Sequence, residues 1–321
     1  MSSCLLVTSA GRRNQLLQCF RDSARTLNVQ LRVLAADLQP ELSPACQQAD
    51  VSFHVPRCTS VDYIPALLDL CRRQQVHVLV PTIDPELAIL SRHIDDFASI
   101  GTRIVISSPA VVALGNDKWL TSVRLANAGI PTPKTVTLAE YRANPESLVG
   151  AVIAKPNTGS ASVGIVRPQT LANLAGLSES NYIVQEMWQG VEYTVNMFFD
   201  RQGILRCMVP HRRLEVRSGE VSKGRTDRVP QLMQVAEKLG NALSGARGPL
   251  CFQAIVQQDG VFCVFEINAR FGGGYPLAHE AGAPFTQWLL EEHLGRELSA
   301  HNNWTNGLTM LRYDSAVYLN A

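Results

Sequence analysis

One apolar stretch near the end of the chain carries side chains that could bind a metal ion and an anion. Glu266, Asn268 and Arg270 occupy alternate positions of this stretch. Alternate side chains of a β-strand point to the same face. One face would therefore carry a carboxylate, a carboxamide and a guanidinium. Such a set suits Mg²⁺, which binds one or two carboxylates and takes its other ligands from water and substrate phosphates.

A second apolar run precedes this one and adds another oxygen donor, Gln253. The two runs flank Asp259-Gly260, a dipeptide typical of two-residue hairpin turns. That turn fixes the register of the hairpin. The predicted pairs are Gln258 with Val261, Gln253 with Glu266, and Cys251 with Asn268.

The same register predicts a polar and an apolar face for the hairpin. Three consecutive glycines follow it, Gly272–Gly274, and they favour a close approach of the backbone to a ligand. An exposed polar face on a two-layer sheet is the alternative interpretation. The polar face would hold Gln253, Ile255, Val264, Glu266, Asn268 and Arg270, and the apolar face Cys263, Phe265 and Ile267.

Gln253, Glu266, Asn268 and Arg270 resemble the metal-binding end of the ATP-grasp superfamily, specifically of its carbamoyl phosphate synthetase large-subunit-like branch. The resemblance implies that the first three hold Mg²⁺ ions bridging the ATP phosphates, with Mn²⁺ as a substitute. It implies that Arg270 stabilises charge on the transferred phosphoryl group. It also implies an ATP-grasp fold, of α/β and α+β class, behind an N-terminal open parallel sheet called the pre-ATP-grasp domain.

Two lysines match the ATP-phosphate lysines of that family. Lys118 opens a capped amphipathic helix predicted over 116–130. Lys155 ends a strand that leads into a Gly/Ser loop containing Gly159 and Ser160, which could fold over phosphates. No Walker A motif occurs. Taken alone, Lys118 is an ordinary first-turn lysine, and a Gly/Ser loop of this kind is more often a plain turn.

The segment after the next predicted strand matches the adenine hinge of the family. Glu186, Met187 and Trp188 would place backbone groups along the adenine edge with apolar walls beside it. The resemblance puts a ribose-contacting carboxylate at Glu192. Alternatively, Met187 and Trp188 belong to the core and Glu192 caps a strand.

A basic segment covers 211–225 and is predicted to form either an ordered wall or a mobile lid. On a strand, His211, Arg213, Glu215 and Arg217 would share one face. Preorganised cations of this kind stabilise a transferring phosphoryl group, and Lys223 is assigned a catalytic role among them. A nucleic-acid patch is not expected, because the net charge is only +1 and aromatic residues are not interleaved.

The N-terminal third alternates strand-like and helix-like segments, which predicts an open parallel sheet. Ligands of such sheets gather at the carboxyl ends of the strands. Arg12 and Glu86 follow two of these ends and are the predicted substrate-binding residues, with Asp84 beside them, whereas Arg13 and Asp37 suit solvated loops. Strands are expected at 4–7, 31–36, 76–80 and 103–106, and helices near 13–26, 61–73 and 85–97. Further on, helices are expected at 228–244, 276–282 and 284–294, and a last strand at 307–318.

Composition restricts the class of protein. The chain has 321 residues and 18% charged residues, which suits two or three packed subdomains. Its eight cysteines form no C-x-x-C pair and read as free thiols in a reducing compartment. No secretory leader or membrane span is recognised, so a cytoplasmic protein is expected. The predicted domains are an N-terminal domain at 1–115, an ATP-grasp small subdomain at 116–188 and a large subdomain at 189–321.

The resemblance implies an ATP-dependent ligase that joins a small-molecule carboxylate to an amine through an acyl phosphate. One alternative is carboxyphosphate formation from bicarbonate, as in carbamoyl phosphate synthesis. Another is a regulatory protein that binds Mg-ATP without turnover. No nucleic-acid or membrane partner is expected, and a homodimer is the commonest state for such enzymes. The acid and the amine are not identified by the sequence.

Overall fold

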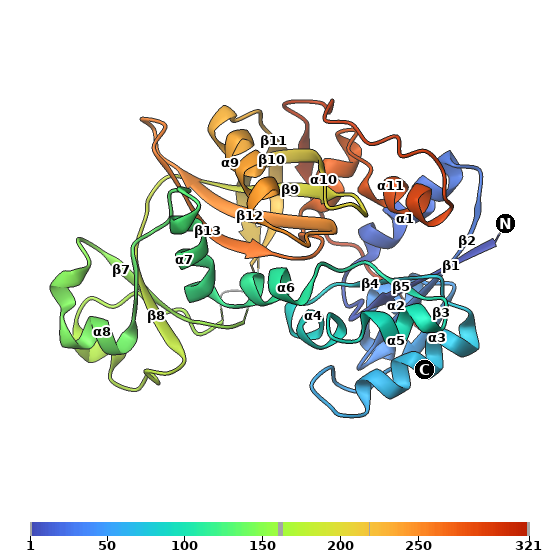
Figure 1. Ribbon diagram of the computed structural model, residues 1–321, viewed down its shortest axis with the longest axis horizontal. Helices are drawn as coiled ribbons and strands as arrows, with labels where there is room; N and C mark the ends of the chain where they lie inside the picture. Colours follow the sequence, from blue (N-terminus) through green and yellow to red (C-terminus); the bar gives the residue numbers. More distant parts are fainter. Residues whose placement is uncertain (1, 160–162, 218, 320–321) are drawn as a thin grey trace.

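The computed structural model describes residues 2–159, 163–217 and 219–319. Figure 1 shows three sheet-containing parts, each assembled largely from one portion of the chain. This arrangement confirms the predicted mixed α/β class with an N-terminal parallel sheet. Ser160, one of the predicted phosphate-loop residues, lies outside the described residues.

The N-terminal part is a five-stranded parallel sheet of order β3-β2-β1-β4-β5. Its central strands β1, β2 and β4 are largely apolar and buried, as is typical of a parallel sheet covered by helices. β3 was not predicted, and two helices replace the single one expected near 85–97. The strands are β1 (Ser2–Thr8), β2 (Gln30–Asp37), β3 (Val51–His54), β4 (Val78–Pro81) and β5 (Arg103–Ile104), and the helices are α1 (Asn14–Thr26), α2 (Pro44–Gln48), α3 (Tyr63–Gln74), α4 (Asp84–Leu90) and α5 (Ile94–Ser99).

A small antiparallel sheet of order β6-β8-β7 follows, and it stands apart at the left of Figure 1. It has a core of its own that includes Leu138, Ala154 and Val184. Two helices, α6 (Pro109–Asn116) and α7 (Lys118–Asn127), lead into it, and Asp117 caps α7 by accepting from the Leu120 N–H. The strands are β6 (Thr135–Thr137), β7 (Val152–Pro156) and β8 (Tyr182–Glu186), and α8 spans Leu138–Ala143.

The C-terminal part is a six-stranded antiparallel sheet of order β13-β12-β9-β10-β11-β14. In the basic segment, residues 211–217 and 220–225 belong to two paired strands, as the ordered-wall alternative predicts. The expected last strand is limited to three residues. The strands are β9 (Val191–Phe199), β10 (Leu205–Arg217), β11 (Glu220–Thr226), β12 (Gly248–Val256), β13 (Phe262–Asn268) and β14 (Thr309–Leu311), and the helices are α9 (Pro230–Ala242), α10 (Tyr275–Glu280) and α11 (Phe285–His293).

The β12–β13 hairpin has the predicted register at its functional end but not at its tip. Gln253 pairs with Glu266, whereas the next pair is Ala254 with Val264, so Phe265 forms a bulge. At the tip the Gln257 N–H donates to the Val261 carbonyl, which closes a three-residue loop. Gly260 has φ +85°, the left-handed conformation that three-residue loops require. The predicted Gln258–Val261 pair is therefore wrong, and the bulge restores the donor register.

The bulge also corrects the predicted faces of the hairpin. Val264 was assigned to the polar face, but it is fully buried in the core with Ile267. Phe265 was assigned to the apolar face, but it lines the same cavity as Glu266. An extra residue in one strand reverses the alternation of side chains beyond it.

The N-terminal and C-terminal parts share a hydrophobic core. Phe20 of α1 lies in one buried cluster with Phe285 and Trp288 of α11, and the hydroxyls of Ser23 and Thr286 are 2.7 Å apart. The eight cysteines are unpaired. Within the described residues, no helix combines the length and apolar character that crossing a bilayer requires.

Candidate active site

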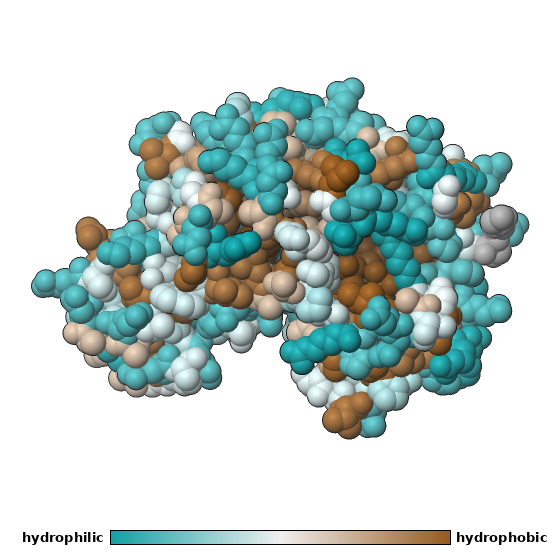
Figure 2. Space-filling view, viewed as in Figure 1, coloured by the Kyte–Doolittle hydropathy of each residue, from teal (hydrophilic) through white to brown (hydrophobic). Residues whose placement is uncertain are grey.

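A cavity of about 940 Å³ lies between the small and the large antiparallel sheets. Its walls come from β7 and β8 on one side and from β10, β12 and β13 on the other, and it extends to loops of the N-terminal sheet. In Figure 2 a notch separates the surface over β7 and β8 from the surface over the N-terminal sheet, and apolar side chains are visible between them. Of the predicted site residues that the structure describes, Glu86 and Lys223 do not line this cavity.

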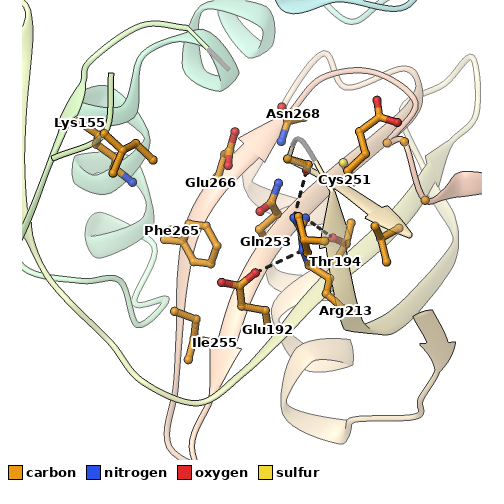
Figure 3. Close-up of a pocket in the computed structure, with 18 of the residues that line it drawn as sticks. Lys155, Glu192, Thr194, Arg213, Cys251, Gln253, Ile255, Phe265, Glu266 and Asn268 are labelled. Atoms are coloured by element: carbon orange, nitrogen blue, oxygen red, sulfur yellow. Dashed lines mark hydrogen bonds and ion pairs between the residues drawn. The ribbon is translucent and has the colours of Figure 1, made fainter. Parts of the chain in front are cut away.

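The three predicted metal ligands lie together on the hairpin, as Figure 3 shows. Gln253 and Glu266 are ladder partners, and Asn268 is on the same strand as Glu266. The described residues contain no group of three acidic, histidine or cysteine side chains that could hold a metal alone. With Glu266 as its one carboxylate, this donor set fits Mg²⁺ only when phosphates supply further ligands. Their assignment to the metal stays a prediction.

Arg270 is anchored to the N-terminal part of the chain. Its guanidinium donates to both carboxylate oxygens of Asp84, at 2.9 and 2.6 Å, and to the side-chain oxygen of Asn268 at 3.1 Å. Burial alone would lower the pKa of Arg270, but the Asp84 carboxylate outweighs it and the pKa is raised. The N-terminal domain thus positions a guanidinium that lies just past the strand of the predicted metal ligands.

The two predicted phosphate lysines line the same cavity as the metal donors, and Figure 3 shows Lys155 across from Gln253. Lys155 is buried at the end of β7, and its Nζ lies 5.6 Å from the centroid of the Phe265 ring. Burial lowers its pKa to about 8, although the Glu266 carboxylate opposes this. Burial likewise lowers the pKa of Lys118, whose Nζ donates to the Gly159 carbonyl at 2.7 Å. The desolvated ammonium groups gain most from a negatively charged ligand.

The predicted adenine hinge borders the same cavity. Met187 and Trp188 line it together with the apolar side chains of Ile153, Ile255 and Phe265. However, the Met187 N–H donates to the Ala151 carbonyl at 2.8 Å. This N–H is already used within the protein, contrary to the expectation that it faces an adenine edge.

Glu192 and Arg213 form an ion pair on the wall of the cavity. Arg213 Nε lies 3.3 Å from the Glu192 carboxylate, and its Nη2 donates to the Gly219 carbonyl at 3.1 Å. Figure 3 shows this guanidinium below Gln253, beside Thr194. Glu192 is therefore held by a cation rather than free, and it remains the predicted ribose ligand.

Lys223 is placed differently from the expectation. Its ammonium lies 2.7 Å from the Glu215 carboxylate on an exposed face of the β10–β11 hairpin. Bulges in β10 between Arg213 and Val216 break the regular alternation of side chains. The single face predicted for the four residues is therefore interrupted after Arg213. Arg212 and Arg213, rather than Lys223, bring cations of this segment into the cavity.

Glu86, a predicted substrate ligand, does not line the cavity and is held by hydrogen bonds within the protein. It is fully buried, and its carboxylate accepts from the backbone N–H groups of Thr82 and Ile83 and from the hydroxyls of Tyr63 and Ser9. Burial raises its pKa despite these hydrogen bonds. Its role is to fix the loop that presents Asp84, whereas Arg12 does line the cavity.

Two sequence-family models match the chain. One, described as "PylC-like, N-terminal domain", matches residues 5–105, and the other, described as "ATP-grasp domain", matches residues 115–274. The chain belongs to the ATP-grasp superfamily. The second match includes both lysines, the hairpin donors and Arg270. No curated protein matches the chain in sequence.

Solved structures share the ATP-grasp fold at low sequence identity. A Campylobacter jejuni biotin carboxylase complex with βγ-ATP has a TM-score of 0.73 at 13% identity, over 96% of this chain and 74% of that one. Staphylococcus aureus N5-carboxyaminoimidazole synthetase with ADP has 0.73 at 15%, over 94% and 80%. The biotin carboxylase domain dimer of Hydrogenobacter thermophilus 2-oxoglutarate carboxylase, with MgADP, ADP and bicarbonate, has 0.72 at 14%, over 93% and 71%.

Several residues of this ATP-grasp cavity were not predicted from the sequence. Thr194 and Phe265 line it, but Thr194 had been given no role and Phe265 had been assigned to the apolar face. Glu220 also lines it and pairs with Arg13 at 2.7 Å. Nothing local in the sequence marks Glu220, because its partner lies in the N-terminal sheet.

Proposed function

We propose that the chain is an ATP-dependent ligase that joins a carboxylic acid to an amine. The observation that carries this proposal is the facing arrangement across one cavity. Lys155, on the small sheet, lies across the cavity from Gln253, Glu266 and Asn268 of the large sheet (Figure 3), and Lys118, at the start of α7, lines the same cavity. Cations opposite oxygen donors suit a triphosphate with a divalent cation.

Different residues would then bind the base, the phosphates and the transferred phosphoryl group of ATP. Met187, Trp188 and Phe265 enclose the base, and the two lysines attract the phosphates. Arg270, fixed by Asp84, lies where it stabilises charge on the transferred group. A bound Mg²⁺ supplies further neutralisation of phosphate charge at Glu266 and its neighbours. Phosphoryl transfer depends mainly on such positioning and charge neutralisation.

The proposed reaction has two steps. A carboxylate oxygen forms a bond to the γ-phosphorus of ATP while the bond to the β–γ bridging oxygen breaks, and ADP leaves. The amine nitrogen then bonds to the acyl carbon, the bond from that carbon to the phosphate oxygen breaks, and the amine proton goes to the departing phosphate. The products are an amide, ADP and phosphate.

Two alternatives differ in the step after ATP binding. With bicarbonate as the acid, the first step gives carboxyphosphate, and one structural neighbour contains bicarbonate. A regulatory protein would bind Mg-ATP without turnover. A second cavity that adjoins the first favours an acid larger than bicarbonate, and the desolvated lysines beside a complete donor set favour turnover over binding alone.

The test is ADP and phosphate release from Mg-ATP with pools of carboxylic acids, with and without pools of amines and amino acids. Release that needs both an acid and an amine supports the ligase. Release with bicarbonate alone supports carboxyphosphate formation. Tight Mg-ATP binding with no release from any pool would overturn the ligase in favour of the regulatory protein. Glu266→Gln is the inactive control.

A further inference from the structure

A second cavity, of about 450 Å³, adjoins the ATP cavity and is not used by the ATP-binding groups described above. Its walls come from the start of α1, the β10–β11 hairpin, the end of β14 and the residues that follow it up to 317. Arg12, Arg13, Glu220 and the Gly272–Gly273 backbone line both cavities. A ligand in the second cavity could therefore reach the predicted metal donors past these residues. We call it the basic chamber.

The basic chamber has more cationic than anionic side chains. Its described lining contains four arginines and two acidic residues, namely Arg12, Arg13, Arg217 and Arg312 with Glu220 and Asp314, and neither lysine nor histidine. Arginine presents a rigid fork of donors that matches carboxylate and phosphate groups. The composition therefore favours a ligand with more than one negative charge.

One carboxylate, that of Glu220, forms ion pairs with two of these arginines. Glu220 lies 2.7 Å from Arg13 and 3.5 Å from Arg312. Arg312 also donates to the Gly273 carbonyl, while its Nε is buried with no hydrogen-bond partner among the described residues. Arg312 thus has one buried donor that the described residues leave without an acceptor.

The positive charges of the partly buried Arg13 and Arg312 are unfavourable to one another. Burial lowers the pKa of Arg13; the Glu220 carboxylate opposes this, whereas the nearby Arg270 and Arg312 add to it. Burial lowers the pKa of Arg312 as well, with Arg12 adding to the effect. An anion placed among them would relieve both the desolvation and the mutual repulsion.

We propose that the basic chamber binds a substrate that carries at least two anionic groups, either carboxylates or a phosphate ester. This inference rests on the proposed ligase function and names the class of its substrate. The anionic groups contact Arg12, Arg13 and Arg312, and the body of the substrate extends past Gly272–Gly273 toward the predicted metal donors. Arg217, paired with Asp314 at 3.2 Å on the surface, lies at the outer edge.

The experiment measures binding of small anions to the purified chain by isothermal titration calorimetry, without ATP and with saturating Mg-ADP. The probes are succinate and citrate for carboxylates, glycerol 3-phosphate for phosphate esters, and acetate as a singly charged control. Tighter binding of succinate or citrate identifies a polycarboxylate, and tighter binding of glycerol 3-phosphate identifies a phosphate ester. Equal binding of acetate, or no binding of any probe, overturns the proposal.

Two variants are expected to act in opposite directions. Arg312→Gln removes charge-assisted hydrogen bonds and should weaken binding of the preferred probe about ten- to a hundredfold. Glu220→Gln frees Arg13 and Arg312 and should strengthen it, an effect that damage to the fold would not produce. Arg73→Gln, on an exposed helix surface, is the matched control. Unchanged binding in both chamber variants would contradict the proposal.

The proposed ligase function and the proposed anion binding in the basic chamber can be refuted independently. Arg312 does not line the ATP cavity, so Arg312→Gln should bind Mg-ATP as the wild type does. If Mg-ATP binds and ADP is released with uncharged or singly charged acids while no dianion binds, only the chamber proposal fails. If dianions bind but no pool supports ADP release, the ligase fails and the chamber remains as an anion site.

Discussion

The ion pair between Asp84 and Arg270 should contribute to folding as well as to catalysis. The two residues are 186 positions apart in sequence, and the guanidinium donates to both carboxylate oxygens at 2.9 and 2.6 Å. Their side chains are only 9% and 12% exposed. Removing one partner of a buried pair costs about 3–5 kcal/mol, because the other charge is left without compensation. We expect Arg270→Gln to lower the free energy of unfolding by about this amount.

The assay is a double-mutant cycle with Asp84→Asn, Arg270→Gln and the double variant, measured by urea unfolding and far-ultraviolet circular dichroism. Because the neutral pair leaves no buried charge, the double variant should be less destabilised than the sum of the single variants. A coupling of about 2–3 kcal/mol is expected. The control cycle uses Asp69 and Arg73, a pair at 2.7 Å with side chains 57% and 63% exposed, where about 0.5 kcal/mol is expected.

A coupling at the Asp84–Arg270 pair no larger than at the control pair would refute the reasoning. It would mean that the N-terminal domain does not fix Arg270. ADP release by Asp84→Asn gives a second readout. If Asp84 positions Arg270 for the transferred phosphoryl group, turnover falls more than ATP affinity does.

Three further predictions concern the cavity and its surroundings. With a pKa of about 8, Lys155 loses its proton in the unliganded protein as pH rises, so ATP affinity by calorimetry should fall about tenfold per pH unit above 8. Lys155→Arg should remove this pH dependence, which is about one tenfold step in ATP affinity per pH unit. An unchanged dependence would contradict the assignment of Lys155 as a phosphate ligand. Glu266→Gln should abolish ADP release while the circular dichroism spectrum is retained; wild-type turnover would exclude the metal role. In Gly274→Ala, the added Cβ would lie 2.6 Å from both His211 Nε2 and Val221 Cγ1. The free energy of unfolding in urea should therefore fall by about 1–3 kcal/mol. The control is Gly176→Ala, where the added Cβ meets no atom within 4 Å and no comparable loss is expected.

The order of the elements was predictable because it depends on local patterns. Apolar runs identified β1 and β2, and the capped helix predicted over 116–130 corresponds to α7, which starts two residues later. β3 (Val51–His54) was missed because none of its residues is fully buried, so it lacks the apolar run of a central strand. The bulge at Phe265 had no signal in the sequence, since it compensates for a turn that is one residue longer than the Asp-Gly pair predicts.

The candidate site was predictable where one short stretch holds several of its residues. Glu266, Asn268 and Arg270 lie within five consecutive positions, so their spacing revealed them. Glu86 was misassigned because its partners are backbone N–H groups and hydroxyls, which leave no trace in residue types. Asp84 and Arg270, and likewise Glu220 and Arg13, meet only through tertiary packing. No local rule could pair them.

The bulge at Phe265 has a practical consequence for engineering the hairpin. It separates the pairs next to the tip from the pairs that carry Gln253 and Glu266, so the two ends of the hairpin are specified independently. Residues added between Asp259 and Gly260 would enlarge an exposed loop while the Gln253–Glu266 spacing stays as it is. The tip is therefore a suitable place for a fluorescent label whose attachment leaves the cavity untouched.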